Sequence, residues 1–167
     1  ITELPKVLAD ITAGRADVTF GSRAIDRSLI GVHQPKRREL GGRVFNLVLR
    51  LATGLPFWDT QCGFKAFRMN VCRPLIEAGS IDGFGFDVEL LYEAHRAGLR
   101  MREIPVGWDH RDGSKVHFLR HGVRMLGDVF TVRKRAAGGW YDRGVRLATL
   151  AAEREGLRAS LPTGAIA

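Results

Sequence analysis

Two carboxylates that follow a glycine-rich loop are the first residues whose types and spacing suggest chemistry. Asp87 and Glu89 come directly after residues 80–85, which include Gly83 and Gly85. The pattern predicts that both acids lie in the first turn of a helix, where the helix dipole favours negative charge. Glycines in the preceding loop let the backbone approach a ligand more closely than a Cβ atom would permit. The pattern fits a charged active site, and it fits equally well acids that only stabilise a helix start.

Three short clusters combine glycine, hydroxyl or cationic residues in ways that suit phosphate. They are residues 21–23 (Gly-Ser-Arg), 36–38 (Lys-Arg-Arg) and 113–115 (Gly-Ser-Lys). Backbone N–H groups, hydroxyls and cationic side chains together can hold phosphate oxygens. Three cations at the start of a helix oppose its dipole unless an anion binds there. Each cluster taken alone also fits an ordinary turn or a solvated basic loop.

Other reactive side chains give weaker signals. His117 and His121 have a spacing found in helical zinc sites, but Phe118 stands where that pattern requires glutamate. Cys62 could act as a nucleophile, although a small buried thiol is the commoner fate of such a residue. Cys62 and Cys72 form no Cys-x-x-Cys pair. We therefore expect reduced thiols in a cytosolic protein.

The composition limits the classes of protein that fit. A chain of 167 residues with 45% apolar content predicts one domain or part of one. Lys and Arg number 26 against 18 Asp and Glu, so the net charge of +8 suggests nucleic acid, phospholipid or a phosphorylated substrate as partner. No apolar run reaches the roughly 18 to 20 residues that a membrane span needs. We expect neither a membrane span nor a secretory signal in residues 1–16.

Alternating strand and helix patterns must position the candidate residues. Short apolar runs predict strands at residues 16–20, 64–67 and 100–106. Residues 24–35 show no period, so we expect a loop there. Helical spacing predicts helices that begin near Thr2 as N-cap, Lys36, Asn70 as N-cap, Phe86 and Val116, with a weak helix from Arg143 to Leu157.

The helix predicted over residues 116–135 carries an apolar stripe with cations beside it. The stripe is formed by Leu119, Val123, Leu126 and Phe130. The cations outside it are Arg120, Arg124, Arg133, Lys134 and Arg135. Such a helix can lie on an anionic membrane surface. A surface helix that packs against a core has the same pattern, so both interpretations stay open.

Five motifs, taken in order, give the sequence a family resemblance. They are residues 21–23, Arg37-Arg38 with Phe45-Asn46, residues 59–65 (Asp-Thr-Gln-Cys-Gly-Phe-Lys), residues 86–91 (Phe-Asp-Val-Glu-Leu-Leu) and residues 113–115. Together they resemble the family 2 glycosyltransferases, and most closely the polyprenyl-phosphate and dolichyl-phosphate glucosyltransferases. The related mannosyltransferases share a looser version, and Gly42 stands near a position where they tend to carry serine. The resemblance covers residues 1 to about 135.

The resemblance implies an α/β fold, namely the C-terminal part of a GT-A Rossmann-like sandwich followed by a basic amphipathic helix. Residues 1–135 would form the acceptor-side portion of a glycosyltransferase domain, and residues 136–167 a peripheral extension. The implied reaction is transfer of a hexose with inversion from a nucleotide diphosphate sugar to polyprenyl or dolichyl phosphate. Glucose is the expected sugar and UDP-glucose the expected donor.

The resemblance also implies roles for individual residues. Asp87 matches the acid that resembles the catalytic base, or the acceptor-site acid, of related transferases. The residues expected to bind substrate are Arg23, Arg38, Asp59, Gln61, Lys65, Glu89, Ser114 and Lys115. The two arginines, Ser114 and Lys115 would hold phosphates, whereas Asp59, Gln61 and Lys65 would line the sugar side. Because a lipid phosphate is already an anion at neutral pH, we expect cations to matter more than a base.

The family typically uses a divalent metal ion, Mg²⁺ or Mn²⁺, held by an Asp-x-Asp motif that this sequence lacks. The resemblance places that motif ahead of Ile1, so we expect a longer enzyme of which this chain is the C-terminal portion. The expected partners are the nucleotide sugar, the polyprenyl phosphate and an anionic membrane surface, and no nucleic acid. The expected location is cytoplasmic and peripheral, at the inner face of the membrane.

Two other functions compete with this one. A basic nucleic-acid-binding module fits the net charge of +8. However, this function would not use Asp87 and Glu89, and the sequence has no recognisable nucleic-acid-binding motif. A related transferase with a hydroxyl acceptor would need Asp87 as a general base.

Overall fold

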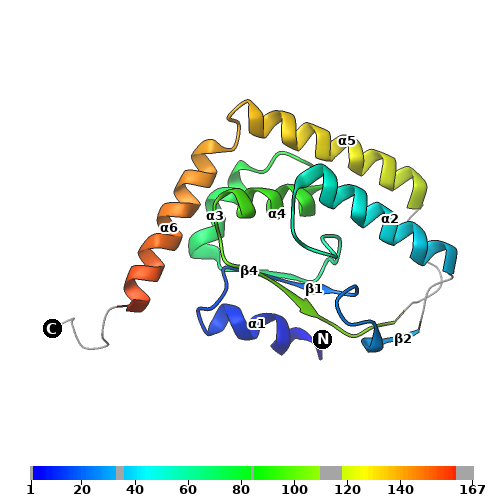
Figure 1. Ribbon diagram of the computed structural model, residues 1–167. Helices are drawn as coiled ribbons and strands as arrows, with labels where there is room; N and C mark the ends of the chain where they lie inside the picture. Colours follow the sequence, from blue (N-terminus) through cyan, green and yellow to red (C-terminus); the bar gives the residue numbers. More distant parts are fainter. Residues whose placement is uncertain (1, 33–35, 84, 110–117, 161–167) are drawn as a thin grey trace.

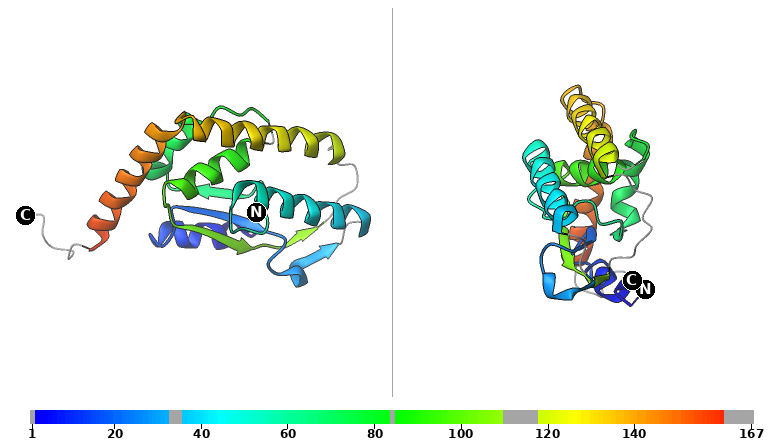
Figure 2. Two further views of the ribbon diagram at one scale, coloured as in Figure 1. Left: turned by 45° about the horizontal axis from the view of Figure 1, so that its top comes forward. Right: turned by 90° about the vertical axis from the view of Figure 1, so that its right-hand side faces the viewer.

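The computed structural model describes residues 2–32, 36–83, 85–109 and 118–160, and it has a mixed α/β fold (Figure 1). A small sheet lies between helix α1 on one side and a layer of longer helices on the other, as Figures 1 and 2 show. This arrangement confirms the predicted α/β class. The finer assignment to the GT-A fold stays a prediction.

Three strands form the central sheet in the order β3-β1-β4. Strand β1 (Val18–Ser22) pairs in parallel with β4 (Met101–Pro105) and antiparallel with β3 (Lys65–Phe67). Every residue of β1 is buried, as expected for a strand that is covered on both faces. The three predicted strands are therefore confirmed, with ends shifted by one or two residues.

The predicted helices are also present. Their bounds are α1 Leu4–Thr12, α2 Lys36–Thr53, α3 Met69–Ala78, α4 Phe86–Arg96, α5 Phe118–Ala137 and α6 Asp142–Ser160. The predicted N-caps are wrong in two cases, because Glu3 precedes α1 and Arg68 precedes α3. Asn70 instead lies inside the first turn of α3. None of the described helices is long and apolar enough to cross a membrane.

The expectation of an irregular loop over residues 24–35 is wrong in part. The 3-10 helix η1 (Arg27–Leu29) and strand β2 (Ile30–Val32) form within it. Strand β2 pairs in parallel with β5 (Trp108–Asp109), which is distant in the sequence. Local periodicity does not reveal such a strand, because a strand of three residues depends on its distant partner.

The main core lies between the central sheet and helices α3, α4 and α6. It contains Val18 and Phe20 of β1, Leu75 of α3, Leu91 of α4 and Ala148 of α6. A smaller cluster packs Val7 of α1 against Cys62, Phe64, Ala66 of β3, and Val106, which follows β4. Burial of this kind supplies about 25 cal/mol for each square ångström of apolar surface removed from water. The sheet is thus fixed from both faces.

Residues 136–167 were expected to form a peripheral extension. Helix α5 continues through the expected boundary to Ala137, and α6 packs along α3. Tyr141 and Ala148 are fully buried, and the Tyr141 hydroxyl donates a hydrogen bond to Glu89 at 2.6 Å. The part of this segment that the structure describes therefore contributes to the core.

Two long helices turn apolar side chains to the outside. On α2, Leu49 is buried, but Leu40, Val44, Leu47 and Leu51 are exposed, Leu51 to 76%. On α5 the core-facing residues are Met125, Val129, Val132 and Ala136. The apolar stripe predicted for α5 is therefore not its buried face, because its members Val123 and Phe130 are exposed. Helices α2 and α5 lie side by side, and each of them leaves apolar side chains exposed (Figures 1 and 2).

Gly144 allows α6 to approach α3, and this gives a stability prediction. A Cβ atom at Gly144 would lie 2.8 Å from the Pro74 carbonyl oxygen, whereas at Gly156 of the same helix it would meet nothing within 4 Å. We predict that Gly144→Ala lowers the free energy of unfolding by about 1 to 3 kcal/mol through overpacking. The matched change Gly156→Ala should raise it by up to about 1 kcal/mol, because alanine favours the helix. Urea unfolding followed by circular dichroism measures both, and equal effects would contradict the packing of α6 on α3.

Candidate functional site

Arg23 and Asp59 form a bidentate ion pair directly beyond the end of β1. Arg23 Nε lies 2.7 Å from Asp59 Oδ2, and Arg23 Nη2 lies 2.9 Å from Oδ1. The Arg23 backbone N–H also donates to Oδ2 at 3.1 Å. Burial by itself would lower the pKa of Arg23, but the hydrogen bonds and charge of Asp59 outweigh it and raise that pKa. Arg23 is therefore a fixed, permanent cation at this end of the sheet.

Glu103 of β4 holds the loop that carries Asp59. Its carboxylate accepts the backbone N–H of Trp58 at 2.9 Å and that of Asp59 at 2.7 Å. The Trp58 ring in turn stacks under the guanidinium of Arg50, 3.9 Å from the ring centre. Strand β4, which is the parallel neighbour of β1, thus positions the acid that orients Arg23.

A second ion pair, between Lys65 and Asp87, joins β3 to the first turn of α4. Lys65 Nζ lies 2.9 Å from Asp87 Oδ1, and the two side chains are only 5% and 13% exposed. Lys65 Nζ also donates to the Cys62 carbonyl oxygen at 2.6 Å. The pair satisfies the rule that a buried charge needs an opposite charge or hydrogen bonds.

Cys62 connects the two ion pairs, because its carbonyl oxygen accepts from Lys65 Nζ and because Arg23 and Asp59 act electrostatically on its thiol. We call the two pairs, Arg23–Asp59 and Lys65–Asp87, together the paired-cation site. Burial raises the pKa of Cys62, so the thiol stays protonated. This supports the interpretation of Cys62 as a buried thiol rather than a nucleophile.

Two buried polar atoms within the same segment have no hydrogen-bond partner among the described residues. They are Thr60 Oγ1 and Gln61 Nε2. Buried polar groups are nearly always hydrogen-bonded, so these two atoms are suited to bind a polar ligand. Gln61 was predicted to line the sugar side, and that role stays a prediction. Thr60 was missed because a single threonine in a loop carries no chemical signal.

Glu89 and Asp87 point to different surroundings although only one residue separates them. Glu89 accepts hydrogen bonds from the Ser80 N–H and hydroxyl, the Ile81 N–H and the Tyr141 hydroxyl. Residues two apart on a helix do not share a face. The structure thus does not bring Glu89 to Lys65. The contacts of Glu89 instead anchor the loop before α4 to Tyr141, in the turn between α5 and α6. Its predicted role in substrate binding has no support in these contacts.

Other predicted site residues lie outside the described part of the molecule. The Arg38 backbone belongs to α2, but its side chain is outside that part, as are Ser114 and Lys115. The side chains of His117 and His121 are outside it as well. The roles predicted for Arg38, Ser114 and Lys115 stay predictions.

The described residues form no ligand set for a divalent metal ion, and the metal ion that the resemblance implies stays a prediction. Within the described ranges, no three His, Cys, Asp or Glu side chains gather as metal ligands do. Asp59 and Asp87 each already pair with a cation. No step of the chemistry below is therefore assigned to a metal ion.

The chain is similar to segments of glycosyltransferases. It is 30% identical over 122 residues to the glycosyltransferase AglD of Haloferax volcanii, which is 73% of this chain and 19% of that protein. It is 40% identical over 83 residues to a dolichyl-phosphate beta-glucosyltransferase of Drosophila melanogaster, 49% of this chain and 26% of that protein. It is 28% identical over 111 residues to an undecaprenyl-phosphate mannosyltransferase of Micrococcus luteus, 66% of this chain and 44% of that protein.

The chain thus matches only part of each of these relatives, from 19% to 44% of their length. No protein-family model matches it, and no solved structure matches it significantly. The similarity confirms the predicted relationship to glycosyltransferases, among them enzymes named for a dolichyl or undecaprenyl phosphate.

The Lys65–Asp87 pair gives a stability prediction through a double-mutant cycle. We predict that Lys65→Met lowers the free energy of unfolding by about 3 to 5 kcal/mol, because it leaves the Asp87 carboxylate buried without its cation. The double variant with Asp87→Leu should lose much less, because neither charge is then unpaired. The measurement is urea unfolding at neutral pH.

The control for this cycle is the exposed pair between Lys6 and Glu3, whose N–O distance of 2.8 Å is similar. Lys6→Met should lower the free energy of unfolding by at most about 1 kcal/mol. A loss in Lys65→Met as small as in Lys6→Met would show that the site pair is not buried.

Proposed function

We propose that the protein is an inverting glycosyltransferase that moves a hexose from a nucleotide diphosphate sugar to a polyprenyl or dolichyl phosphate. The observation that carries the proposal is the similarity to relatives whose names include dolichyl phosphate or undecaprenyl phosphate. Glucose is the first choice of sugar and UDP-glucose the first choice of donor. We further propose that the observed sheet belongs to a GT-A fold.

The proposed reaction makes one bond and breaks one. An oxygen of the acceptor phosphate attacks the anomeric carbon of the sugar, the bond to the nucleoside diphosphate breaks, and the diphosphate leaves with the electron pair. No proton has to be removed from the acceptor, because its phosphate oxygen is already anionic at neutral pH. Catalysis then depends on position and on neutralising charge.

The paired-cation site has the properties that this reaction requires. Arg23 uses Nε and Nη2 for Asp59, and Lys65 uses its amine for Asp87 and the Cys62 carbonyl. Each cation keeps a further N–H group that can donate to a phosphate oxygen. Because the carboxylates fix both cations in advance, little reorganisation is needed when the anion binds. In this proposal Asp87 orients Lys65, and it removes no proton.

The exposed apolar faces of α2 and α5 support a position at the membrane surface. We propose that the outer residues Leu40, Val44, Leu47 and Leu51 of α2, with Val123 and Phe130 of α5, contact the lipid. The net charge of +8 favours an anionic surface such as the inner, cytoplasmic leaflet. Of the cations predicted for this contact, Arg124 is exposed, but Arg133 donates to the Ala52 carbonyl oxygen of α2 at 2.8 Å. Arg133 thus also joins the two helices.

The proposed role of Asp87 gives an activity prediction for the full-length protein. With radiolabelled UDP-glucose and polyprenyl phosphate, we expect a labelled lipid product that partitions into organic solvent. Asp87→Asn should reduce the rate by about a hundredfold, because a displaced Lys65 misplaces the acceptor phosphate. GDP-mannose in a parallel reaction tests the choice of sugar.

The matched control is Asp82→Asn, because Asp82 is an exposed acid in the loop before α4. It should keep the wild-type rate. A wild-type rate in Asp87→Asn would refute the site assignment, provided that thermal melting shows both variants folded. Absence of a labelled lipid with either donor would refute the function itself.

A further inference from the structure

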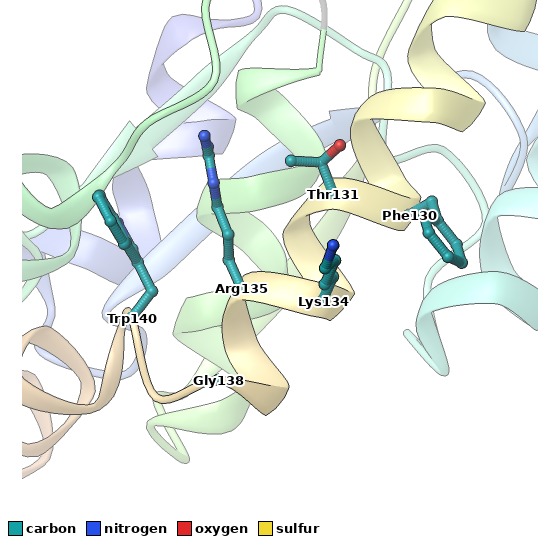
Figure 3. A pocket seen from close by; sticks show the side chains of 6 residues that line it. All are labelled: Phe130, Thr131, Lys134, Arg135, Gly138 and Trp140. Carbon is teal, nitrogen blue, oxygen red and sulfur yellow. The ribbon is translucent and has the colours of Figure 1, made fainter.

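A second concave site lies far along α5 from the start of that helix, where α5 ends and turns into α6. It is a cavity of about 490 Å³ lined by Phe130, Thr131, Lys134, Arg135, Gly138 and Trp140 (Figure 3). All of these residues come from the last turns of α5 and the short turn that follows. None of them belongs to the paired-cation site.

Two cations of this cavity have no acidic partner among the described residues. The side chain of Lys134 is exposed, and its amine makes no hydrogen bond or ion pair within the described part. Arg135 donates from Nη1 to the Ser80 carbonyl and hydroxyl oxygens, and its guanidinium lies 5.4 Å from the centre of the Trp140 ring. The Ser80 and Trp140 contacts hold Arg135 in place, and the Ser80 hydroxyl in turn donates to the buried Glu89 carboxylate. The unpaired Lys134 amine, with the fixed Arg135 beside it, favours an anion.

Two aromatic rings flank these cations and face the solvent. Phe130 is 73% exposed and Trp140 is 61% exposed. The Trp140 indole N–H is tied to the Ala78 carbonyl oxygen at 3.3 Å, so the ring is held outward. Exposed aromatic rings beside cations are typical of surfaces that rest at the boundary between lipid headgroups and acyl chains.

The cavity is continuous with the apolar face already described. Val123 precedes Phe130 by two helical turns on the same side of α5, and α2 with its outer leucines lies alongside. Phe130 belongs both to this face and to the cavity lining, so a bilayer that contacts the face also meets the cavity. Binding of a soluble phosphate would not explain why the rings of Phe130 and Trp140 are exposed.

We propose that this cavity binds the phosphodiester headgroup of an anionic phospholipid, with Lys134 and Arg135 on the phosphate and with Phe130 and Trp140 against the glycerol and upper acyl chain. The inference rests on the membrane contact in the proposed function, and it adds a headgroup site separate from the acceptor phosphate. The bound lipid fixes the end of α5 on the membrane surface.

The test measures binding of the full-length protein to phosphatidylcholine vesicles with and without phosphatidylglycerol. We expect wild type to prefer the vesicles that contain phosphatidylglycerol, and Lys134→Glu to weaken that binding by about tenfold or more. Arg154→Glu changes the net charge equally on an exposed position of α6, about three helical turns beyond the start of that helix, and should weaken binding by less than about threefold. Equal losses in the two variants would overturn the site, because they would show attraction by net charge alone.

Tryptophan fluorescence reports on the cavity directly. We expect phosphatidylglycerol vesicles to shift the emission of wild type to shorter wavelength, and Trp140→Phe to lose most of that shift while keeping Trp58 and Trp108. A shift that is undiminished in Trp140→Phe would overturn the proposal. So would an equal shift with soluble glycerol phosphate, which would identify a site for free phosphate instead of lipid.

Transferase activity in detergent separates this inference from the proposed function. Lys134→Glu should act on a polyprenyl phosphate in micelles at the wild-type rate, because the cavity lies outside the paired-cation site. If wild type makes no labelled lipid but the vesicle results hold, only the function fails. If it does make labelled lipid and Lys134→Glu binds vesicles as wild type does, only the cavity assignment fails.

Discussion

The buried ion pair between Lys65 and Asp87 is the interaction on which the arrangement of the site depends. It joins an edge strand of the central sheet to the first turn of α4, with 2.9 Å between Lys65 Nζ and Asp87 Oδ1. Neither charge could remain buried alone, so the sheet and the helix must stay in register. The segment between them carries Cys72 and Leu75 into the core, and this packing keeps the two ends of the pair together.

The same device recurs at Arg23, where Asp59 fixes a cation and Glu103 fixes Asp59. In both pairs the carboxylate is engaged in an ion pair that orients a cation. A general base instead needs a carboxylate that is free to accept a proton from the substrate. Such a site suits an acceptor that is already an anion. A polyprenyl substrate also requires the enzyme to reach a lipid surface. The exposed apolar residues of α2 and α5 are suited to that contact.

Much of the fold could be predicted from the sequence because it depends on local patterns. The apolar run at residues 16–20 and the helical spacing that begins near Lys36 predicted β1 and α2 correctly. The pairing of β2 with β5 could not be predicted, because each strand is too short to show a period. Helical spacing predicted α2 without showing that its apolar residues Leu40, Val44, Leu47 and Leu51 are exposed.

The candidate site could be predicted in part for similar reasons. The resemblance named Arg23, Asp59, Lys65 and Asp87 as site residues, and the structure shows that they form two ion pairs, while their roles stay predictions. The sequence could not show that they pair with one another, since 36 positions separate Arg23 from Asp59. It also could not separate Asp87 from Glu89, whose partners come from Ser80, Ile81 and Tyr141.

The most direct test of the central claim is a crystal structure of the full-length protein with a soluble short-chain prenyl phosphate. We expect the phosphate oxygens to lie about 3 Å from the free N–H groups of Arg23 and Lys65, with both carboxylate partners still in place. A phosphate that is bound elsewhere and touches neither cation would contradict the claim that the paired-cation site receives the acceptor.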